Sequence, residues 1–120
     1  MTSPFRETIN AICSALPGAV WSDPWGGGHD AWKVGDKMFA CMGSMTPGVS
    51  VKCADVETAT LLKEHGIAHN APYFHKSWVR FDEDANTDEL KARIEASYKI
   101  IFSKLPAKTR KAISETQEVA

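Results

Sequence analysis

The stretch AWKVGDKMFACM, residues 31–42, decides the fold because it joins two strand-forming runs through a tight turn. The runs AWKV and KMFACM carry aromatic and apolar residues that favour β-structure, and only Gly35 and Asp36 separate them. Glycine first in a two-residue loop is typical of a type II′ turn. The stretch predicts an antiparallel hairpin. Lys33 and Lys37 flank its turn and make it a candidate surface for an anion.

Helical patterns lie on both sides of this hairpin. Ser3 suits an N-cap and Pro4 the first helical position, and Pro17 and Gly18 end the pattern. The apolar residues between them follow helical spacing: Phe5, Ile9, Ile12 and Leu16. We therefore expect a helix before the first strand.

The rest of the chain predicts three more helices. One runs from the N-cap residue Asp55 to Gly66, which suits the position after a helix. Another begins at Asn86, which forms a capping-box pattern with Glu89. Its apolar stripe is Leu90, Ile94, Tyr98, Ile101 and Leu105. Pro106 then begins a short final helix.

Two further runs predict strands of the same sheet. In VSVKC, residues 49–53, apolar and polar side chains alternate, which predicts one buried and one solvated face. Lys52 is therefore expected on the open face. In SWVRF, residues 77–81, Trp78 and Arg80 share one face and the apolar residues share the other.

The composition agrees with one folded domain. The chain has 120 residues, of which 43% are hydrophobic and 24% charged, and this length suits a core without disulfides or metal. The order of elements predicts a single α+β domain over residues 1–120, an antiparallel sheet with helices packed on one face. The net charge of −1 is unlike that of a strongly basic nucleic-acid binder, so any such binding would come from a local patch.

A cytoplasmic location is expected from three features. The N-terminus MTSPFRETIN lacks the pattern of a signal peptide, and no apolar run is long enough to cross a membrane. Cys13, Cys41 and Cys53 are odd in number and form no C-x-x-C pair. We expect three reduced thiols, mostly buried.

Six motifs occur in the order and spacing of a known family: LPGA, WKVGDKMFA, VSVKC, APYFHKSWV, ELKARIEASY and LPAKTRK. Through them the chain resembles the MmcQ/YjbR family over nearly its whole length. The resemblance implies a fold similar to the bacterial frataxin CyaY, and DNA binding through a proposed double-wing arrangement of strands. It implies no catalytic residues. The chain departs from the family in being less basic and in its longer glycine run, residues 26–28.

Basic and aromatic residues in or beside the strands are candidates for nucleic-acid or anion binding. They are Lys33, Lys37, Lys52, Lys76, Trp78 and Arg80. Lysines neutralise phosphates, and an exposed tryptophan, here Trp78 or Trp32, stacks on a base. We expect a non-enzymatic protein whose DNA binding is weak, salt-sensitive and without sequence-specific readout.

Two other segments offer alternatives. A basic stretch free of acidic residues contains Lys99, Lys104, Lys108, Arg110 and Lys111, and its simpler explanation is a solvated helix face. A second cluster contains Pro72, Tyr73, Lys76 and Trp78. It would suit a small anion or a protein partner, or else form half-buried core with the lysine stem lying over it.

Patterns for metal binding and catalysis have simpler explanations. His65 and His69 have the H-x-x-x-H spacing of some zinc pairs, but Gly66 should break the helix between them. The acidic run DEDANTDE, residues 82–89, is a possible iron site by analogy with frataxins, and it also fits a loop and a helix start. The motifs G-x-S-x-G, H-E-x-x-H and the P-loop are missing. We expect no enzymatic activity, no metal and no cofactor.

Overall fold

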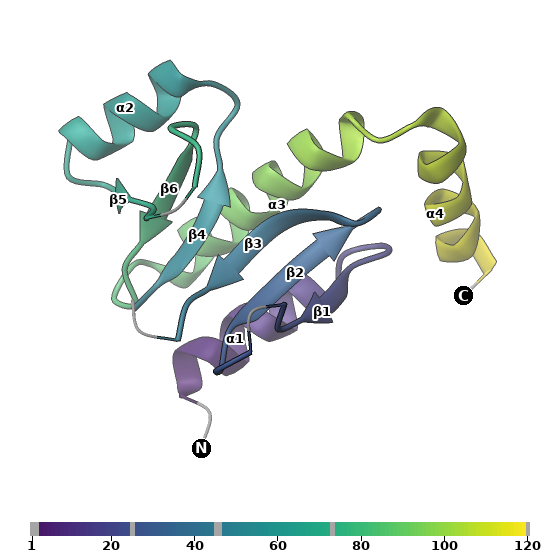
Figure 1. The fold of residues 1–120 in the computed structure, drawn as a ribbon, viewed down its shortest axis with the longest axis horizontal. Helices are drawn as coiled ribbons and strands as arrows, with labels where there is room; N and C mark the ends of the chain where they lie inside the picture. Colours follow the sequence, from purple (N-terminus) through teal and green to yellow (C-terminus); the bar gives the residue numbers. More distant parts are fainter. Residues whose placement is uncertain (1–2, 25, 45–46, 73, 120) are drawn as a thin grey trace.

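The computed structural model describes residues 3–24, 26–44, 47–72 and 74–119 (Figure 1). In chain order its elements are α1 (Pro4–Ser14), β1 (Val20–Ser22), β2 (Asp30–Val34), β3 (Lys37–Met42), β4 (Val49–Lys52), α2 (Val56–Glu64), β5 (His69–Asn70), β6 (Trp78–Phe81), α3 (Thr87–Ser103) and α4 (Ala107–Val119). The predicted α+β class is therefore confirmed.

The described strands form one antiparallel sheet in the order β1-β2-β3-β4-β6-β5. Helices α1 and α3 lie against one face of this sheet, as predicted, and the central strands turn their other face outward (Figure 1). Helix α2 packs beside β5 and β6. Helix α4 reaches the rest of the domain near Gly18, where Ile113 lies close to the backbone.

The predicted helix starts are confirmed by their caps. The Ser3 hydroxyl accepts a hydrogen bond from the Arg6 N–H at 3.2 Å, and the Asp55 carboxylate accepts one from the Thr58 N–H at 2.7 Å. Asn86 caps α3 through its side-chain oxygen. Each cap satisfies N–H groups that have no partner within the helix.

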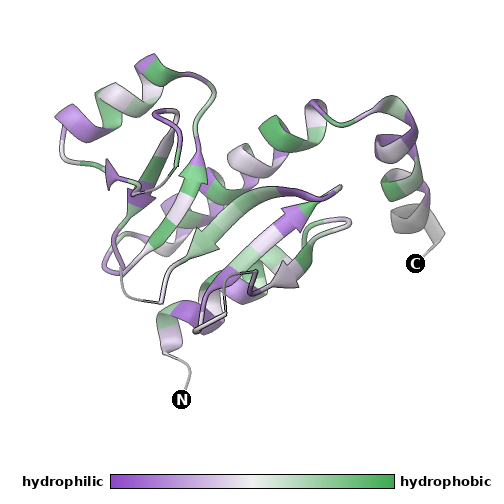
Figure 2. Cartoon of the chain, viewed as in Figure 1, coloured by the Kyte–Doolittle hydropathy of each residue, from purple (hydrophilic) through white to green (hydrophobic). Residues whose placement is uncertain are grey.

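The core lies between the sheet and helices α1 and α3. Its largest fully buried side chains include Phe39, Phe81, Ile9 and Ile94. Figure 2 shows that β3 is hydrophobic along most of its length, as expected for a central strand under a helix. The Tyr98 ring meets Phe39 edge to face at 5.4 Å, which joins α3 to this strand.

The hairpin between β2 and β3 is confirmed, but its predicted turn type is wrong. Gly35 has a φ of 55° and Asp36 a φ of 66°, and two residues with positive φ define a type I′ turn rather than type II′. Aspartate tolerates this conformation better than most residues. Glycine suits position 35, because φ is positive there and an added Cβ would lie 2.7 Å from the end of the Leu105 side chain.

The strand register also confirms the predicted faces. Val49 and Val51 are buried and pair with Phe81 and Val79 on the core side of the sheet. The alternate pair, Lys52 with Trp78, therefore lies on the side away from α1 and α3.

Candidate functional site

Because neighbouring strands are antiparallel, the β2–β3 turn, the end of β4 and the start of β6 meet at one end of the sheet (Figure 1). We call this the hairpin end. The other end holds the start of β2, the end of β6 and the loops joined to them, and we call it the opposite end. The two ends arrange their charged side chains differently.

Five lysines gather at the hairpin end. They are Lys33, Lys37, Lys52, Lys76 and Lys104. Lys104 is the C-cap of α3, and the next residue, Leu105, packs over Gly35 in the turn. Among the described residues, no carboxylate lies within ion-pair distance of these five lysines. The nearby acids are Asp36 in the turn and Asp55, whose carboxylate caps α2.

Lys52 has a specific environment within this group. Its Nζ donates a hydrogen bond to the Ser77 hydroxyl at 2.6 Å. The same hydroxyl lies 2.9 Å from His75 Nδ1, which also accepts the Ser77 backbone N–H at 3.1 Å. Partial burial, and then the charge of Lys104, lowers the pKa of Lys52. The Lys52 side chain is therefore held in place by the Ser77 hydroxyl.

Ser97 of α3 fixes the backbone at this point. Its hydroxyl donates to the Phe39 carbonyl at 2.7 Å and accepts the Lys52 N–H at 2.9 Å. The Ser97 hydroxyl therefore lies between β3 and β4, just past the point where the two strands stop pairing with each other. The last paired residues are Ala40 and Val51. Ser97 was not predicted from the sequence as part of the site. The sequence feature that could have indicated it is a polar side chain three positions after Ile94, within the apolar stripe of α3.

The two tryptophans predicted to stack on bases are both buried. Trp78 is 9% exposed and stacks on Phe74 with ring centroids 4.5 Å apart. Trp32 is 7% exposed, and its indole N–H donates to Asn10 of α1 at 2.8 Å. Neither indole presents an open face in this structure. Trp21, which is 51% exposed on the edge strand β1, was not singled out from the sequence.

Arg80 lies at the opposite end, apart from the lysines. Its guanidinium donates to the Pro47 carbonyl at 2.9 Å and to the Asp82 carboxylate at 2.9 Å. Asp82 also accepts a hydrogen bond from His69 at 2.6 Å. The bonds from His69 and then Arg80 lower the pKa of Asp82. The structure therefore pairs Arg80 with a carboxylate, and it does not bring this residue to the other predicted site residues.

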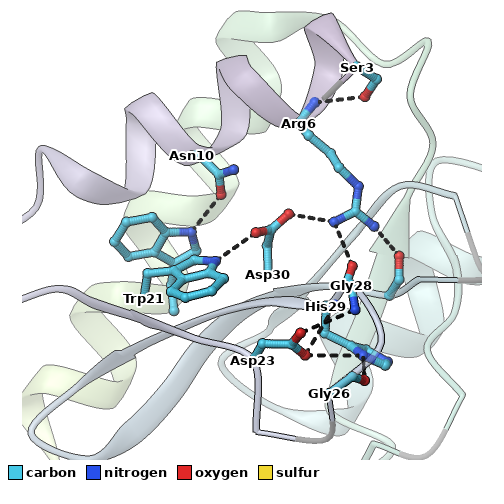
Figure 3. Close-up of polar contacts among 11 residues, drawn as sticks. Ser3, Arg6, Asn10, Trp21, Asp23, Gly26, Gly28, His29 and Asp30 are labelled. Carbon is cyan, nitrogen blue, oxygen red and sulfur yellow. Dashed lines mark hydrogen bonds and ion pairs between the residues drawn. The ribbon is translucent and has the colours of Figure 1, made fainter. Parts of the chain in front are cut away.

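A polar cavity of about 430 Å³ also lies at the opposite end. Arg6 of α1 lines this cavity. Its guanidinium contacts the Asp30 carboxylate and the carbonyls of Gly28 and Gly43 (Figure 3). The Trp21 indole N–H donates to Asp30 at 2.6 Å. These contacts tie α1 to the glycine loop and to the β3–β4 loop. The charged groups of this cavity are thus already paired.

The remaining predictions have mixed outcomes. Tyr73 of the proposed aromatic cluster lies outside the described residues, whereas Pro72 and Lys76 are exposed. In the basic C-terminal stretch, Lys111 lies 4.0 Å from Glu115. All three cysteines are buried, as predicted. Burial raises the pKa of Cys13 to about 12.

The described residues contain no group of three or more His, Cys, Asp or Glu side chains placed to hold a metal ion. His69 pairs with Asp82, and Glu89 of the acidic run pairs with Arg93. Over the same part of the chain, no helix combines the length and apolar character needed to cross a membrane.

These features define a small α+β protein with an antiparallel sheet, two helices against one face and a basic end. The YjbR family model matches residues 14–100, and the chain belongs to this family. Its fold is similar to that of the crystal structure of Deinococcus radiodurans protein DR2400, described with the family-model domain DUF419. The TM-score is 0.80 at 20% identity, and the match covers 95% of this chain and 92% of that one. A search of curated proteins found no match.

Proposed function

We propose that this protein binds nucleic acid through its hairpin end. The observation that carries the proposal is the gathering of five lysines that have no ion-pair partner among the described residues. Lysines in this arrangement neutralise backbone phosphates and release bound counterions. The net charge of −1 is compatible with this function, because the positive charge is local rather than spread over the chain.

The contacts are expected to be with phosphates rather than with bases. Lys37 and Lys76 are exposed and provide mobile positive charges, whereas Lys52 is held by Ser77. The burial of Trp78 disfavours base stacking, and the ion pair of Arg80 with Asp82 removes this arginine from the contact set. Binding without sequence preference follows, because phosphate contacts carry no base information.

A binding role also fits the Lys52, Ser77 and His75 contacts better than catalysis does. A serine between a lysine and a histidine is reminiscent of nucleophilic sites. Ser77, however, is 2% exposed, and its oxygen accepts a hydrogen bond from the Lys52 ammonium, which weakens it as a nucleophile. We therefore propose that the protein is not an enzyme.

Fluorescence anisotropy with labelled single- and double-stranded DNA tests this function at low and then moderate salt. Micromolar binding is expected, with an affinity that falls steeply as salt rises. Lys37→Glu should weaken binding about tenfold at low salt, because it replaces an attraction with a repulsion.

Lys91→Glu is the matched control, because it makes the same charge change on an exposed residue near the N-terminus of α3, toward the opposite end. It should change affinity less than about threefold. Equal losses in the two variants would indicate a general charge effect and reject the hairpin end as the binding surface. Binding that is insensitive to salt would reject the phosphate mechanism.

A further inference from the structure

The turn that precedes β6 is closed by a side chain as well as by the backbone. The Trp78 N–H donates to the His75 carbonyl at 2.9 Å, with Lys76 and Ser77 as the central residues of the turn. The His75 ring lies against the same turn, where its Nδ1 accepts the Ser77 backbone N–H at 3.1 Å. Asparagine and aspartate side chains close turns in the same way. The His75 ring is therefore part of the turn that carries Lys76.

The Ser77 hydroxyl connects this ring to Lys52. Lys52 Nζ donates to the hydroxyl oxygen at 2.6 Å, and the hydroxyl lies 2.9 Å from His75 Nδ1. Because an ammonium group can only donate, the hydroxyl hydrogen is directed at Nδ1. Ser77 is 2% exposed, so water has little access to replace these partners. His75 Nδ1 consequently acts as an acceptor for both the N–H and the O–H of Ser77.

These contacts require a neutral His75 ring. A neutral imidazole has one donor and one acceptor nitrogen, whereas both nitrogens of an imidazolium are donors. In a protonated ring the Nδ1 hydrogen would point at the Ser77 N–H, and only one hydroxyl group would separate the imidazolium from the Lys52 ammonium. Like charges repel at this range. Protonation should therefore break the contacts between the ring and the turn.

The surroundings of the turn are mostly basic. The neighbouring strand contributes Lys52, and the next residue, Cys53, donates its N–H to the Ser77 carbonyl at 2.7 Å. Burial raises the pKa of the Cys53 thiol, which stays uncharged. The other charged side chains that act on these two residues are Lys63, Arg93, Lys104 and Asp55, whose carboxylate caps α2. No carboxylate of the described residues lies within ion-pair distance of His75, so a protonated ring is available to an external anion.

We propose that His75 is a proton-controlled switch of the hairpin end. Its neutral ring is held in the turn, and its protonated ring is released as a further cation for DNA phosphates. His75 is exposed, so the released ring can reach a ligand. Histidine changes charge between about pH 5 and 8, and affinity for DNA should rise as pH falls through this range. The effect on DNA rests on the proposed function, whereas the opening of the turn does not.

Fluorescence anisotropy with duplex DNA, at constant ionic strength and with a label that is insensitive to pH, tests the effect on binding. The duplex should bind about five- to tenfold more tightly at about pH 5.5 than at about pH 7.5, because one more positive charge meets a phosphate. The slope of log K against log salt concentration should steepen by about 0.9 at the lower pH. An affinity and a slope that do not change with pH would overturn the switch and leave the proposed function standing.

Variants assign the pH response to His75. His75→Asn keeps a side-chain oxygen that can accept the Ser77 N–H but cannot take up a proton. Its affinity at about pH 7.5 should be within about twofold of the parent protein, and the rise at low pH should be lost. His65→Asn makes the same change at the exposed C-cap of α2 and should retain the rise. A rise that survives in His75→Asn, or that disappears in His65→Asn, would reject the assignment.

NMR of the protein without DNA tests the opening of the turn. As pH falls, the Ser77 amide proton should lose its hydrogen bond, and its chemical shift should follow the signals of the His75 ring. His75→Asn should abolish this step. A Ser77 amide that does not respond to protonation of His75 would overturn the switch, whether or not DNA binds. Failure to bind DNA at every pH would reject the proposed function, and the Ser77 amide would still decide whether the turn opens.

Discussion

The two ends of the sheet use their charged residues in different ways. At the opposite end, Arg6 pairs with Asp30, and Arg80 and His69 pair with Asp82. At the hairpin end, the five lysines have no carboxylate partner among the described residues. The first arrangement fastens loops to helices and strands. The second leaves positive charge available to a ligand.

This difference shows why the number of charged residues is a poor guide to function here. A partly buried ion pair that is also hydrogen-bonded becomes costly to break. Unpaired like charges, in contrast, repel each other and contribute nothing to folding. Residues held at some cost to stability are often found at functional sites. The following predictions test this division between a structural end and the proposed binding end.

The largest expected effect is at the opposite end. Arg6→Ala should lower the free energy of unfolding by about 2 kcal/mol, because it leaves the partly buried Asp30 carboxylate with only the Trp21 N–H and frees two loop carbonyls. Urea denaturation measures this loss. Lys91→Ala, at an exposed position, should change stability by less than about 0.5 kcal/mol.

Arg6→Ala should leave the affinity of the folded protein for DNA within about twofold of the parent protein, because Arg6 is far from the proposed contacts and already paired. A large loss of binding in a variant that is fully folded at the assay temperature would show that the two ends are coupled, and the comparison would fail.

At the hairpin end we expect a smaller change in the free energy of unfolding, in the opposite direction. Lys104→Gln should leave stability unchanged or raise it by up to about 0.5 kcal/mol, because it removes a repulsion with Lys52. The gain should shrink as salt is added. The same urea titrations measure it. A clear loss of stability would mean that Lys104 makes a stabilising interaction. The hairpin end would then use its charges to stabilise the fold, as the opposite end does.

Most of the fold could be predicted from the sequence because local signals agreed with one another. Ser3, Asp55 and Asn86 marked helix starts, and alternation in β4 and β6 gave the correct faces. The turn type was predicted wrongly. The two turn types differ in the φ of the second turn residue, here Asp36 with a φ of 66°, and a glycine at the first position is compatible with both types.

Four of the five lysines at the hairpin end were named as site candidates from the sequence, whereas Lys104 was assigned to a separate basic stretch. Strand alternation placed Lys52 on the open face, but the pairing of Arg80 with Asp82 depends on how β6 continues into the following loop. The bridge from Ser97 to Lys52 joins residues 45 positions apart. Such contacts depend on tertiary packing, for which a single sequence contains no periodic signal.

The smallest expected effects are changes in the pKa of one residue at each end of the sheet, Lys52 at the hairpin end and Asp82 at the opposite end. In an NMR titration, Lys52 should lose its proton at lower pH than an ordinary lysine, and Lys104→Gln should raise the pKa of Lys52, because a like charge is removed. Folding lowers this pKa, so the charge of Lys52 opposes folding at neutral pH and ceases to do so as pH rises toward 10.5.

At the opposite end, His69→Ala should raise the pKa of Asp82 toward 3.8, because the carboxylate loses a hydrogen-bond donor. Here ionisation favours the folded state, and the benefit is lost as pH falls below 3.8 through the lowered pKa. Lys91→Gln, remote from both groups, should move neither value. If the Lys52 titration does not respond to Lys104→Gln, the charge of Lys104 does not act on Lys52, and burial alone lowers the pKa of Lys52.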